Sequence, residues 1–312
     1  MLPIRVQLRL GGLLGRGFYW IRPKYRRIAR MNIDRCFPHW SEEQKASCIR
    51  DHFQSIGMSV PEVANAWWAS EKQLQPLNVV EGSEYLDAAH AKGRGVVLLS
   101  AHFTTLEITG ILLGLFRRPV DAFYRRPRNK LVDRVMRKGR SRAIERLIPS
   151  NDFPAAIRSL REGRTIWYAF DQHQKQARGS MMIPFFGEPS LTNPALRTLV
   201  KRTGAAVVPF YAVRVVGRRV RYVLRFGPEL AEFPSYDCGA DLLRLKQILE
   251  GMVTTAPAQY LWTRDHFKYK LAGQPVADIG AVSVSGGDRA GEFESPEARL
   301  ESPASSASAR GA

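Results

Sequence analysis

The residues best suited to carry chemistry are His102 and Glu107, in the stretch GRGVVLLSAHFTTLEITG at residues 93–110. Residues 96–99 form a short apolar run after two glycines, which is typical of a buried strand. Thr104 and Thr105 could cap a helix that begins just after them. Because ligands bind at the carboxyl ends of strands in open α/β sheets, His102 stands where a catalytic residue is expected.

The spacing of His102 and Glu107 limits how the two side chains can meet. Residues five apart on one helix point about 140° away from each other, so His102 must lie in the loop and Glu107 in the first turns of the helix. The Glu107 carboxylate would then accept the Nδ1 proton of His102 and leave Nε2 as a base for a substrate hydroxyl. A buried histidine bonded to a backbone carbonyl, beside a solvated glutamate, is the alternative, and this stretch alone favours it.

Charged side chains follow two further predicted strands. Residues 120–124 look like a second strand, and residues 125–146 after it carry ten Lys or Arg and only two acids. Arginine binds phosphate bidentately and lysine as a point charge, so this segment indicates a phosphate site; a solvated basic helix is the alternative. Residues 165–170 predict a third strand, and Asp171 at its end would point into the same cleft unless it caps a helix or pairs with an arginine.

A family resemblance raises the significance of these residues. HFTTLE at 102–107 resembles the HX4D/E motif of the lysophospholipid acyltransferase superfamily. Its setting is similar to the late acyltransferases of lipid A biosynthesis, the Kdo-dependent lauroyl or myristoyl transferases. The resemblance runs in matching order over roughly residues 10 to 270, through NIDRCFPHWSEEQ (32–44), HFQSIGMSVPEVANAWW (52–68), FYRRP (123–127), GRTIWYAFDQ (163–172), IPFFG (183–187), RTGAAVVPFYAVR (202–214) and APAQYLWTRDHFK (256–268).

The resemblance implies an α/β fold, a single domain with a mixed, mainly parallel sheet covered by helices. It also implies an O-acyltransferase of lipopolysaccharide biosynthesis, which moves a fatty acyl chain from acyl carrier protein to a hydroxyl of a Kdo-lipid A precursor. His102 and Glu107 would form the base dyad. A related acyltransferase acting on a lysophospholipid or a phosphatidylinositol mannoside would use the same dyad, so that alternative stays open.

Further site residues follow from the same resemblance. Arg140 and Asp171 are expected to be catalytic, with Asp171 positioning Arg140 or the substrate. The expected substrate-binding residues are those of the FYRRP segment, Tyr124, Arg125 and Arg126. The family usually has proline before the aspartate, where this chain has Phe170. No cofactor and no metal are expected, since acyl-acyl carrier protein serves as a co-substrate.

The charge of the chain indicates a polyanionic partner. The formal net charge is +18, and residues 272–312 carry six acids and three arginines, so residues 1–271 carry about +21. Nucleic acid, an anionic membrane or a phosphorylated substrate would all suit this charge. A non-enzymatic membrane- or nucleic-acid-binding protein would explain the charge but not the HX4E motif. The resemblance therefore favours an anionic lipid acceptor at the cytoplasmic face of the inner membrane, and no nucleic acid.

Composition divides the chain into three predicted parts. Residues 1–35 carry nine Lys or Arg and one acid among apolar residues, which predicts a basic amphipathic, membrane-proximal segment. Its glycines should weaken that helix, Pro23 should interrupt it, and an ordinary helix covering the sheet is the alternative. Residues 36–271 are the expected acyltransferase domain, and residues 272–312 a disordered tail. No apolar run is long enough to span a bilayer, so attachment is expected to be peripheral, or spanning if the N-terminus is truncated.

Local patterns predict several other elements. Ser41 and Gln44 form a capping box for a helix through Phe53, and residues 63–68 look like a separate helical stretch. Residues 205–215 and 220–226 should form a hairpin, and residues 183–187 an apolar turn. The three cysteines are odd in number and lack CxxC spacing, so neither a disulfide framework nor a zinc site is indicated.

Overall fold

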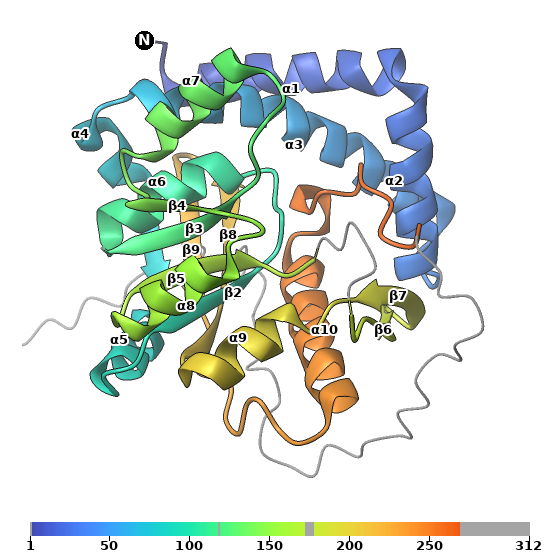
Figure 1. The fold of residues 1–312 in the computed structure, drawn as a ribbon. Helices are drawn as coiled ribbons and strands as arrows, with labels where there is room; N and C mark the ends of the chain where they lie inside the picture. Colours follow the sequence, from blue (N-terminus) through green and yellow to red (C-terminus); the bar gives the residue numbers. More distant parts are fainter. Residues whose placement is uncertain (1, 118, 172–177, 269–312) are drawn as a thin grey trace, which may run out of the picture.

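A seven-stranded sheet forms the centre of the computed structural model, which describes residues 2–117, 119–171 and 178–268 (Figure 1). The strand order is β1-β9-β8-β2-β5-β3-β4, and every neighbouring pair is parallel except the antiparallel pair β8–β9. The strands are β1 (Asn78–Glu81), β2 (Val96–Ser100), β3 (Val120–Tyr124), β4 (Arg146–Pro149), β5 (Thr165–Ala169), β8 (Ala206–Val216) and β9 (Val220–Phe226). The predicted mixed, mainly parallel sheet is confirmed.

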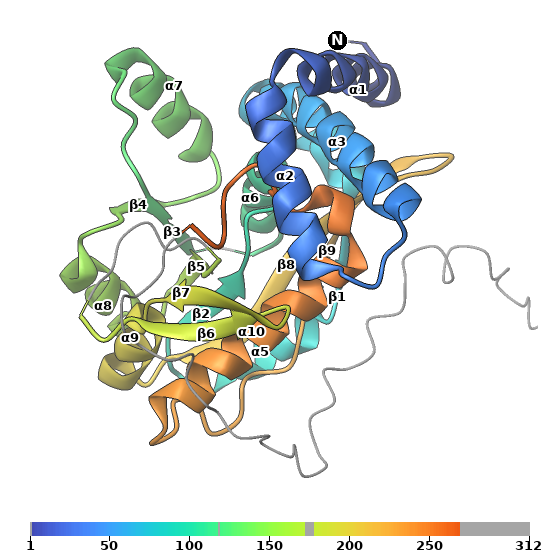
Figure 2. The ribbon, with the colours of Figure 1, turned by 90° about the vertical axis from the view of Figure 1, so that its right-hand side faces the viewer.

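Helices cover both faces of this sheet (Figures 1 and 2). They are α1 (Ile4–Ile21), α2 (Pro23–Cys36), α3 (Glu42–Trp68), α4 (Glu71–Leu74), α5 (Ser83–Ala91), α6 (Leu106–Phe116), α7 (Lys130–Arg140), α8 (Phe153–Arg161), α9 (Ala195–Thr203) and α10 (Cys238–Thr255), with two short 3₁₀ turns, η1 (Gln75–Leu77) and η2 (Pro257–Gln259). Every residue of β2 is buried, and its side chains alternate between two apolar clusters. Val97 and Leu99 belong to one cluster and Val96 and Leu98 to the other, as expected for a strand with a helix layer on each side.

The link between β2 and α6 positions His102, but its threonines do not cap the helix. The Thr105 hydroxyl donates to the Ala212 carbonyl at 3.1 Å, and the Thr104 hydroxyl lies 2.6 Å from the Ser55 hydroxyl. Both side chains therefore tie the loop to neighbouring elements, β8 and α3. The predicted caps are wrong because these hydroxyls have tertiary partners instead of helical N–H groups.

The glycines of α1 do not interrupt the helix, and they allow a close crossing with α3. α1 runs unbroken and packs on α3, not on the sheet (Figure 1). A Cβ atom added to Gly15 would lie 2.1 Å from the Phe53 carbonyl oxygen, and one added to Gly57 would lie 2.1 Å from the Gly11 carbonyl oxygen. Pro23 separates α1 from α2 as expected, since it is the first residue of α2.

α3 is one long helix where two shorter ones were predicted. The capping box at its start is confirmed: the Gln44 N–H donates to the Ser41 hydroxyl at 3.2 Å, and the Ser41 N–H donates to the Gln44 side chain at 2.8 Å. The helix then continues through Pro61, although proline cannot make the usual backbone hydrogen bond there. α1 contacts α3 on both sides of Pro61: Gly15 lies against Phe53, and the Asn65 side chain donates to the Gln7 side chain at 2.6 Å. Packing of this kind supplies most of the stability of a helix in a protein.

The two predicted chain reversals differ in outcome. The hairpin of β8 and β9 is confirmed. Residues 183–187 are more than a turn, since they belong to a second hairpin formed by β6 (Met181–Phe185) and β7 (Glu188–Thr192). The predicted tail at 272–312 lies outside the described residues. In the described part of the chain, no helix combines the length and the apolar character needed to cross a bilayer.

Candidate functional site

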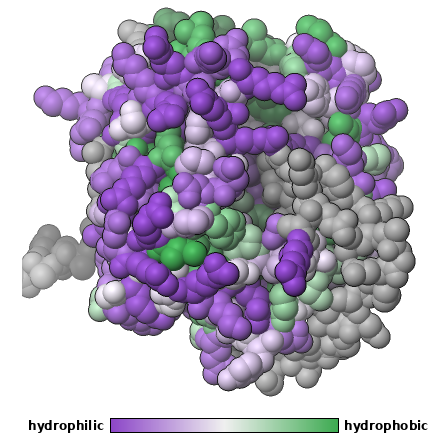
Figure 3. All heavy atoms as spheres, in the orientation of Figure 1, coloured by the Kyte–Doolittle hydropathy of each residue, from purple (hydrophilic) through white to green (hydrophobic). Residues whose placement is uncertain are grey.

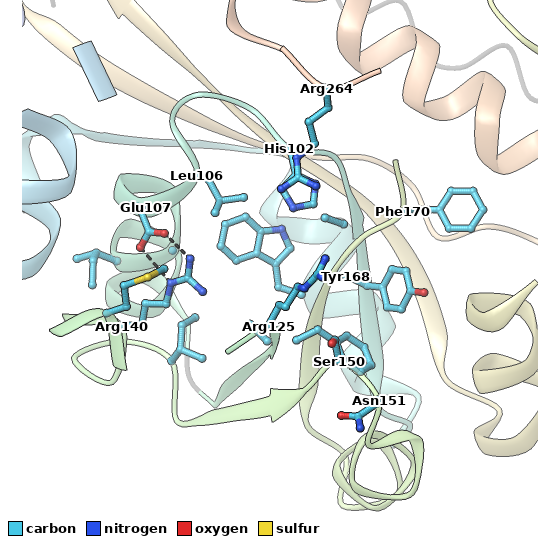
Figure 4. Close-up of a pocket in the computed structure, with 18 of the residues that line it drawn as sticks. His102, Leu106, Glu107, Arg125, Arg140, Ser150, Asn151, Tyr168, Phe170 and Arg264 are labelled. Atoms are coloured by element: carbon cyan, nitrogen blue, oxygen red, sulfur yellow. Dashed lines mark hydrogen bonds and ion pairs between the residues drawn. The ribbon is translucent and has the colours of Figure 1, made fainter. Parts of the chain in front are cut away.

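A cavity of about 800 Å³ opens beside the carboxyl ends of β2, β3 and β5 (Figure 4). It is lined by four of the predicted site residues, His102, Glu107, Arg125 and Arg140. Asp171 lies behind His102 and does not line the cavity. The remaining lining is largely apolar and includes Trp67, Leu106, Ile111, Phe123, Met136, Ile144, Trp167 and Phe170.

His102 is held by Asp171 and not by Glu107. The His102 Nδ1 atom lies 2.7 Å from the Asp171 Oδ1 atom, and the His102 backbone N–H donates to Oδ2 at 3.2 Å. The two residues come together because β2 and β5 are neighbours in parallel register, with Ser100 opposite Ala169. Each side chain lies two residues beyond that last pair, so both stand at the same edge of the sheet. The predicted contact between His102 and Glu107 is therefore wrong.

The surroundings of Asp171 determine which imidazole nitrogen of His102 carries the proton. The Asp171 side chain is 1% exposed, whereas that of His102 is 29% exposed. Burial alone would raise the pKa of Asp171, but the charge and hydrogen bonds of His102 outweigh it and lower that pKa well below its ordinary value. An ionised carboxylate only accepts hydrogen bonds, so Nδ1 must be the donor. In the neutral form of the imidazole, Nδ1 therefore carries the proton and Nε2 is the proton acceptor.

A segment from the end of the described chain supports this pair. The fully buried Tyr260 donates its hydroxyl to the Asp171 Oδ2 atom at 3.1 Å. The Leu261 N–H donates to the His102 carbonyl at 3.0 Å, and the Thr104 N–H donates to the Gln259 carbonyl at 2.8 Å. Tyr260 lies in the resemblance segment APAQYLWTRDHFK, but no sequence pattern pointed to a role for it. A buried tyrosine needs a hydrogen-bond partner, and this requirement was the one available signal.

Phe170, where the resemblance leads us to expect proline, makes a contact that proline could not. Its side chain is 1% exposed, and its N–H donates to the Ser100 carbonyl at 2.8 Å. Proline has no N–H to donate. Phe170 therefore extends the pairing of β5 with β2 up to the residue before Asp171.

Glu107 forms a second, separate cluster with Arg140. The Arg140 Nε atom donates to the Glu107 Oε2 atom at 3.1 Å, and a second arginine nitrogen donates to Oε1 (Figure 4). The indole N–H of Trp67 donates to the same Oε2 atom at 3.2 Å. Both charged side chains are less than one-fifth exposed. The expectation that Asp171 positions Arg140 is wrong, because Glu107 does so across the cavity wall.

The three predicted substrate-binding residues of the FYRRP segment divide between two places: two of them contact Asp133, and one lines the cavity. The Tyr124 hydroxyl donates to the Asp133 Oδ1 atom at 2.7 Å, and the Arg126 Nε atom donates to Oδ2 at 3.1 Å. Burial, and then the bond to Asp133, raise the pKa of Tyr124 to about 12. The Tyr124 ring also lies beneath the Arg140 guanidinium, 5.4 Å from the ring centre. Only Arg125 lines the cavity, and Figure 4 shows its side chain extending into it.

Arg264, which no sequence pattern singled out, also lines the cavity. Among the described residues, neither Arg125 nor Arg264 forms an ion pair with a carboxylate. These two cations can therefore meet anionic groups of a ligand, while Arg140 is already paired. The described part of the chain contains no group of three or more His, Cys, Asp or Glu side chains placed to hold a metal ion.

Together these residues could deprotonate a hydroxyl beside cationic and apolar surfaces. His102 offers Nε2 as a base, Arg125 and Arg264 offer positive charge, and the apolar lining can receive a hydrocarbon chain. Such a site suits chemistry on an amphipathic, anionic substrate.

Comparison with known proteins agrees with this chemistry. Residues 1–269 match the family model described as bacterial lipid A biosynthesis acyltransferase. The chain is 32% identical over 248 residues to the lipid A biosynthesis palmitoleoyltransferase of Escherichia coli K12, covering 79% of this chain and 80% of that protein. It is 29% identical over 275 residues to the lauroyltransferase (88% and 89% covered) and 25% identical over 267 residues to the myristoyltransferase (85% and 81% covered) of the same organism. The chain thus belongs to the family of bacterial lipid A biosynthesis acyltransferases.

Proposed function

We propose that this protein transfers a fatty acyl chain from acyl carrier protein to a hydroxyl of a Kdo-lipid A precursor, at the cytoplasmic face of the inner membrane. Membership of the family supports an enzyme that acylates lipid A precursors. The names of the three relatives support a fatty acyl group as the cargo. The thioester donor and the membrane face are part of the proposal.

One observation carries the proposed mechanism: the 2.7 Å contact between His102 Nδ1 and the buried Asp171 carboxylate, with the imidazole lining the cavity. The His102 Nε2 atom takes the proton of the acceptor hydroxyl as its oxygen attacks the thioester carbonyl carbon. The tetrahedral intermediate then collapses, the carbon–sulfur bond breaks, and the imidazolium returns the proton to the leaving thiolate. Asp171 holds the productive tautomer and stabilises the transient imidazolium.

The cations of the cavity have two proposed roles. Arg125 and Arg264 bind phosphate or carboxylate groups of the acceptor and stabilise negative charge that develops on the carbonyl oxygen. Arg140 is held by Glu107, so these two residues shape the cavity wall and position the substrate. In this mechanism Glu107 is a positioning residue, and Asp171 takes the place beside the base that Glu107 was expected to have.

The apolar lining of the cavity is proposed to receive the acyl chain. Leu106, Ile111 and Met136 are among the lining residues, and burial of each further methylene contributes about 0.8 kcal/mol. A chain one methylene shorter than the preferred one would therefore bind about fourfold more weakly, and a chain two methylenes shorter about fifteenfold more weakly. The preferred length follows from a donor series.

Peripheral attachment through α1 is the proposed mode of membrane association. Leu10, Leu13 and Leu14 are 50%, 58% and 64% exposed, and Arg9 and Arg16 lie on the same helix. Figure 3 shows apolar side chains along the α1 edge of the molecule among strongly hydrophilic ones. This combination suits a helix lying in a lipid headgroup layer.

The test is acyl transfer from a series of acyl-acyl carrier protein thioesters to a Kdo-containing lipid A precursor. Wild type and His102→Ala are compared with His39→Ala, which removes an exposed histidine outside the cavity. We expect product with wild type and His39→Ala, and a loss of about a hundredfold or more with His102→Ala. Product only with a lysophospholipid or a phosphatidylinositol mannoside would overturn the proposed acceptor. Product with acyl-coenzyme A but not with the carrier protein would overturn the proposed donor.

A further inference from the structure

α7 is attached to the rest of the molecule at its carboxyl-terminal end and, on one face of its first turns, through the buried Asp133. Gly139 packs against Trp67 so closely that an added Cβ atom would lie 2.3 Å from the indole ring. Arg140 is held by Glu107, and Met136 lines the cavity. Figure 2 shows α7 projecting from the side of the sheet that carries β3 and β4. α7 therefore forms one wall of the cavity and projects beyond it.

The amino-terminal half of α7 carries apolar side chains with nothing packed over them. Leu131, Val132 and Val135 are 69%, 44% and 36% exposed. At 100° per residue the three side chains fall within about 100° of the helix circumference, so they form one strip. Scattered exposed apolar residues are ordinary, but a strip on one face of a helix beside a cavity indicates an apolar partner.

The same helix is strongly cationic on its outside. Exposed basic side chains occur along it and just before it, at Arg128, Lys130, Arg134, Arg137 and Lys138. The acid of α7, Asp133, is buried and accepts hydrogen bonds from Tyr124 and Arg126, so it does not offset these charges at the surface. An apolar strip bordered by cations is complementary to a bilayer that contains anionic lipid.

α7 and α1 stand at the same end of the molecule in both perpendicular views (Figures 1 and 2). A single lipid surface lying across that end would be within reach of both helices. The cavity is lined by α7 on one side and by Trp67 of α3 on another, and α3 carries α1. A bilayer touching both helices would thus lie next to the cavity.

From these observations we infer that α7 is a second membrane-docking helix, which binds an anionic bilayer together with α1 and holds the cavity against the lipid surface. This inference takes only one point from the proposed function, namely that the acceptor substrate reaches the cavity from a lipid surface. The alternative partner for a basic helix is an acidic protein such as the acyl donor's carrier. The exposed apolar strip favours the bilayer.

The test places a polarity-sensitive fluorophore on α7 and needs no catalysis. Val132→Cys is labelled in a Cys238→Ser background, because Cys36 and Cys48 are buried and Cys238 is only half-buried. Leu14→Cys reports on α1, and Tyr236→Cys, at a fully exposed loop position, is the matched control. On vesicles containing phosphatidylglycerol we expect a blue shift and protection from iodide quenching at positions 132 and 14 but not at 236.

Three outcomes would overturn the inference. A label that becomes protected at position 14 but stays in water at 132 would show docking by α1 alone. A response at 132 to acyl carrier protein but not to vesicles would identify a protein partner. Equal responses on neutral and anionic vesicles would remove the role of the charges.

As a second variant, Leu131→Ser/Val132→Ser/Val135→Ser should lower vesicle partitioning about tenfold or more while the melting temperature stays within a few degrees of that of the wild type.

Since these vesicles contain neither acyl donor nor lipid A precursor, the result is independent of whether the proposed reaction is correct. An enzyme that acylates another acceptor could still dock through α7, and the proposed reaction could still occur if docking uses α1 alone.

Discussion

Replacing Asp171 by Asn tests how His102, the proposed base, is held. The carboxylate accepts three hydrogen bonds: from the His102 ring at 2.7 Å, from the His102 backbone at 3.2 Å and from the Tyr260 hydroxyl at 3.1 Å. An amide of the same shape offers only one oxygen in place of two. If that oxygen stays on Nδ1, the amide NH₂ faces two donors. If the amide flips, its NH₂ forces Nδ1 to accept, and the proton moves to Nε2, where it disables the base.

The expected cost follows from these contacts. A hydrogen bond to a charged group contributes about 1.5 to 3 kcal/mol, and each 1.36 kcal/mol is tenfold in rate. Weaker stabilisation of the imidazolium alone would therefore slow the reaction by about 10- to 100-fold. If the productive tautomer is also lost, the reaction slows further, toward the full contribution of a general base, a factor of about 10² to 10⁴. We expect kcat to fall within about 10² to 10⁴ with little change in KM.

The assay is steady-state acyl transfer to the lipid A precursor, with circular dichroism and a melting curve to show that the variant is folded. Tyr260→Phe serves as the matched change, because it removes only one of the three donors and should lower kcat by about tenfold. A folded Asp171→Asn variant that keeps kcat within about threefold of wild type would refute the reasoning.

Three further predictions concern stability. Gly57→Ala should loosen α1 from α3, since the added Cβ would lie 2.1 Å from the Gly11 carbonyl oxygen. Calorimetry should show a loss of about 1 to 3 kcal/mol or more in the free energy of unfolding, and an unchanged melting temperature would contradict the close crossing. Arg214→Met should lower the free energy of unfolding by about 3 to 5 kcal/mol in denaturant titration, because it removes the charge partner that the buried Glu62 now has at 2.6 Å. The double variant Arg214→Met/Glu62→Gln should recover part of this loss, and no recovery would count against the pair. Burial lowers the pKa of Lys246 to about 8. Between pH 8 and about 10.4 the unfolded chain therefore binds more protons than the folded one, so the contribution of Lys246 to stability should rise with pH across that window. That rise should be missing in Lys246→Met, and identical pH dependence in both proteins would disprove the assignment.

The parts of the site that could be predicted from the sequence are those set by local pattern. The apolar run of β2 and the run of β5 placed His102 and Asp171 at strand ends, because burial of a central parallel strand leaves a continuous apolar signature. The β8–β9 hairpin could be predicted because a short turn with a glycine, residues 216–219, separates two apolar runs. β1 and β4 were missed because each has only four residues and lies at an edge of the sheet, where the apolar signature is weak.

The partner of His102 could not be predicted, because it depends on which strands become neighbours. Asp171 lies 69 residues away in sequence and meets His102 only because β5 pairs with β2. The nearer acid, Glu107, satisfied the spacing argument but is taken by Arg140 of α7. The close crossing at the glycines of α1 could not be predicted for a similar reason, because it depends on the packing of α3 against them.

The central claim, that His102 and Asp171 act as one unit, is tested most directly by a double-mutant cycle in the acyl-transfer assay. Residues that act as a unit are not additive, so His102→Ala/Asp171→Asn should be no slower than His102→Ala within about threefold, although Asp171→Asn alone loses about a hundredfold or more. Glu107→Gln should lower the rate by the same factor in both the wild-type and the His102→Ala backgrounds. A cycle in which Glu107→Gln, and not Asp171→Asn, loses its effect once His102 is removed would contradict the account.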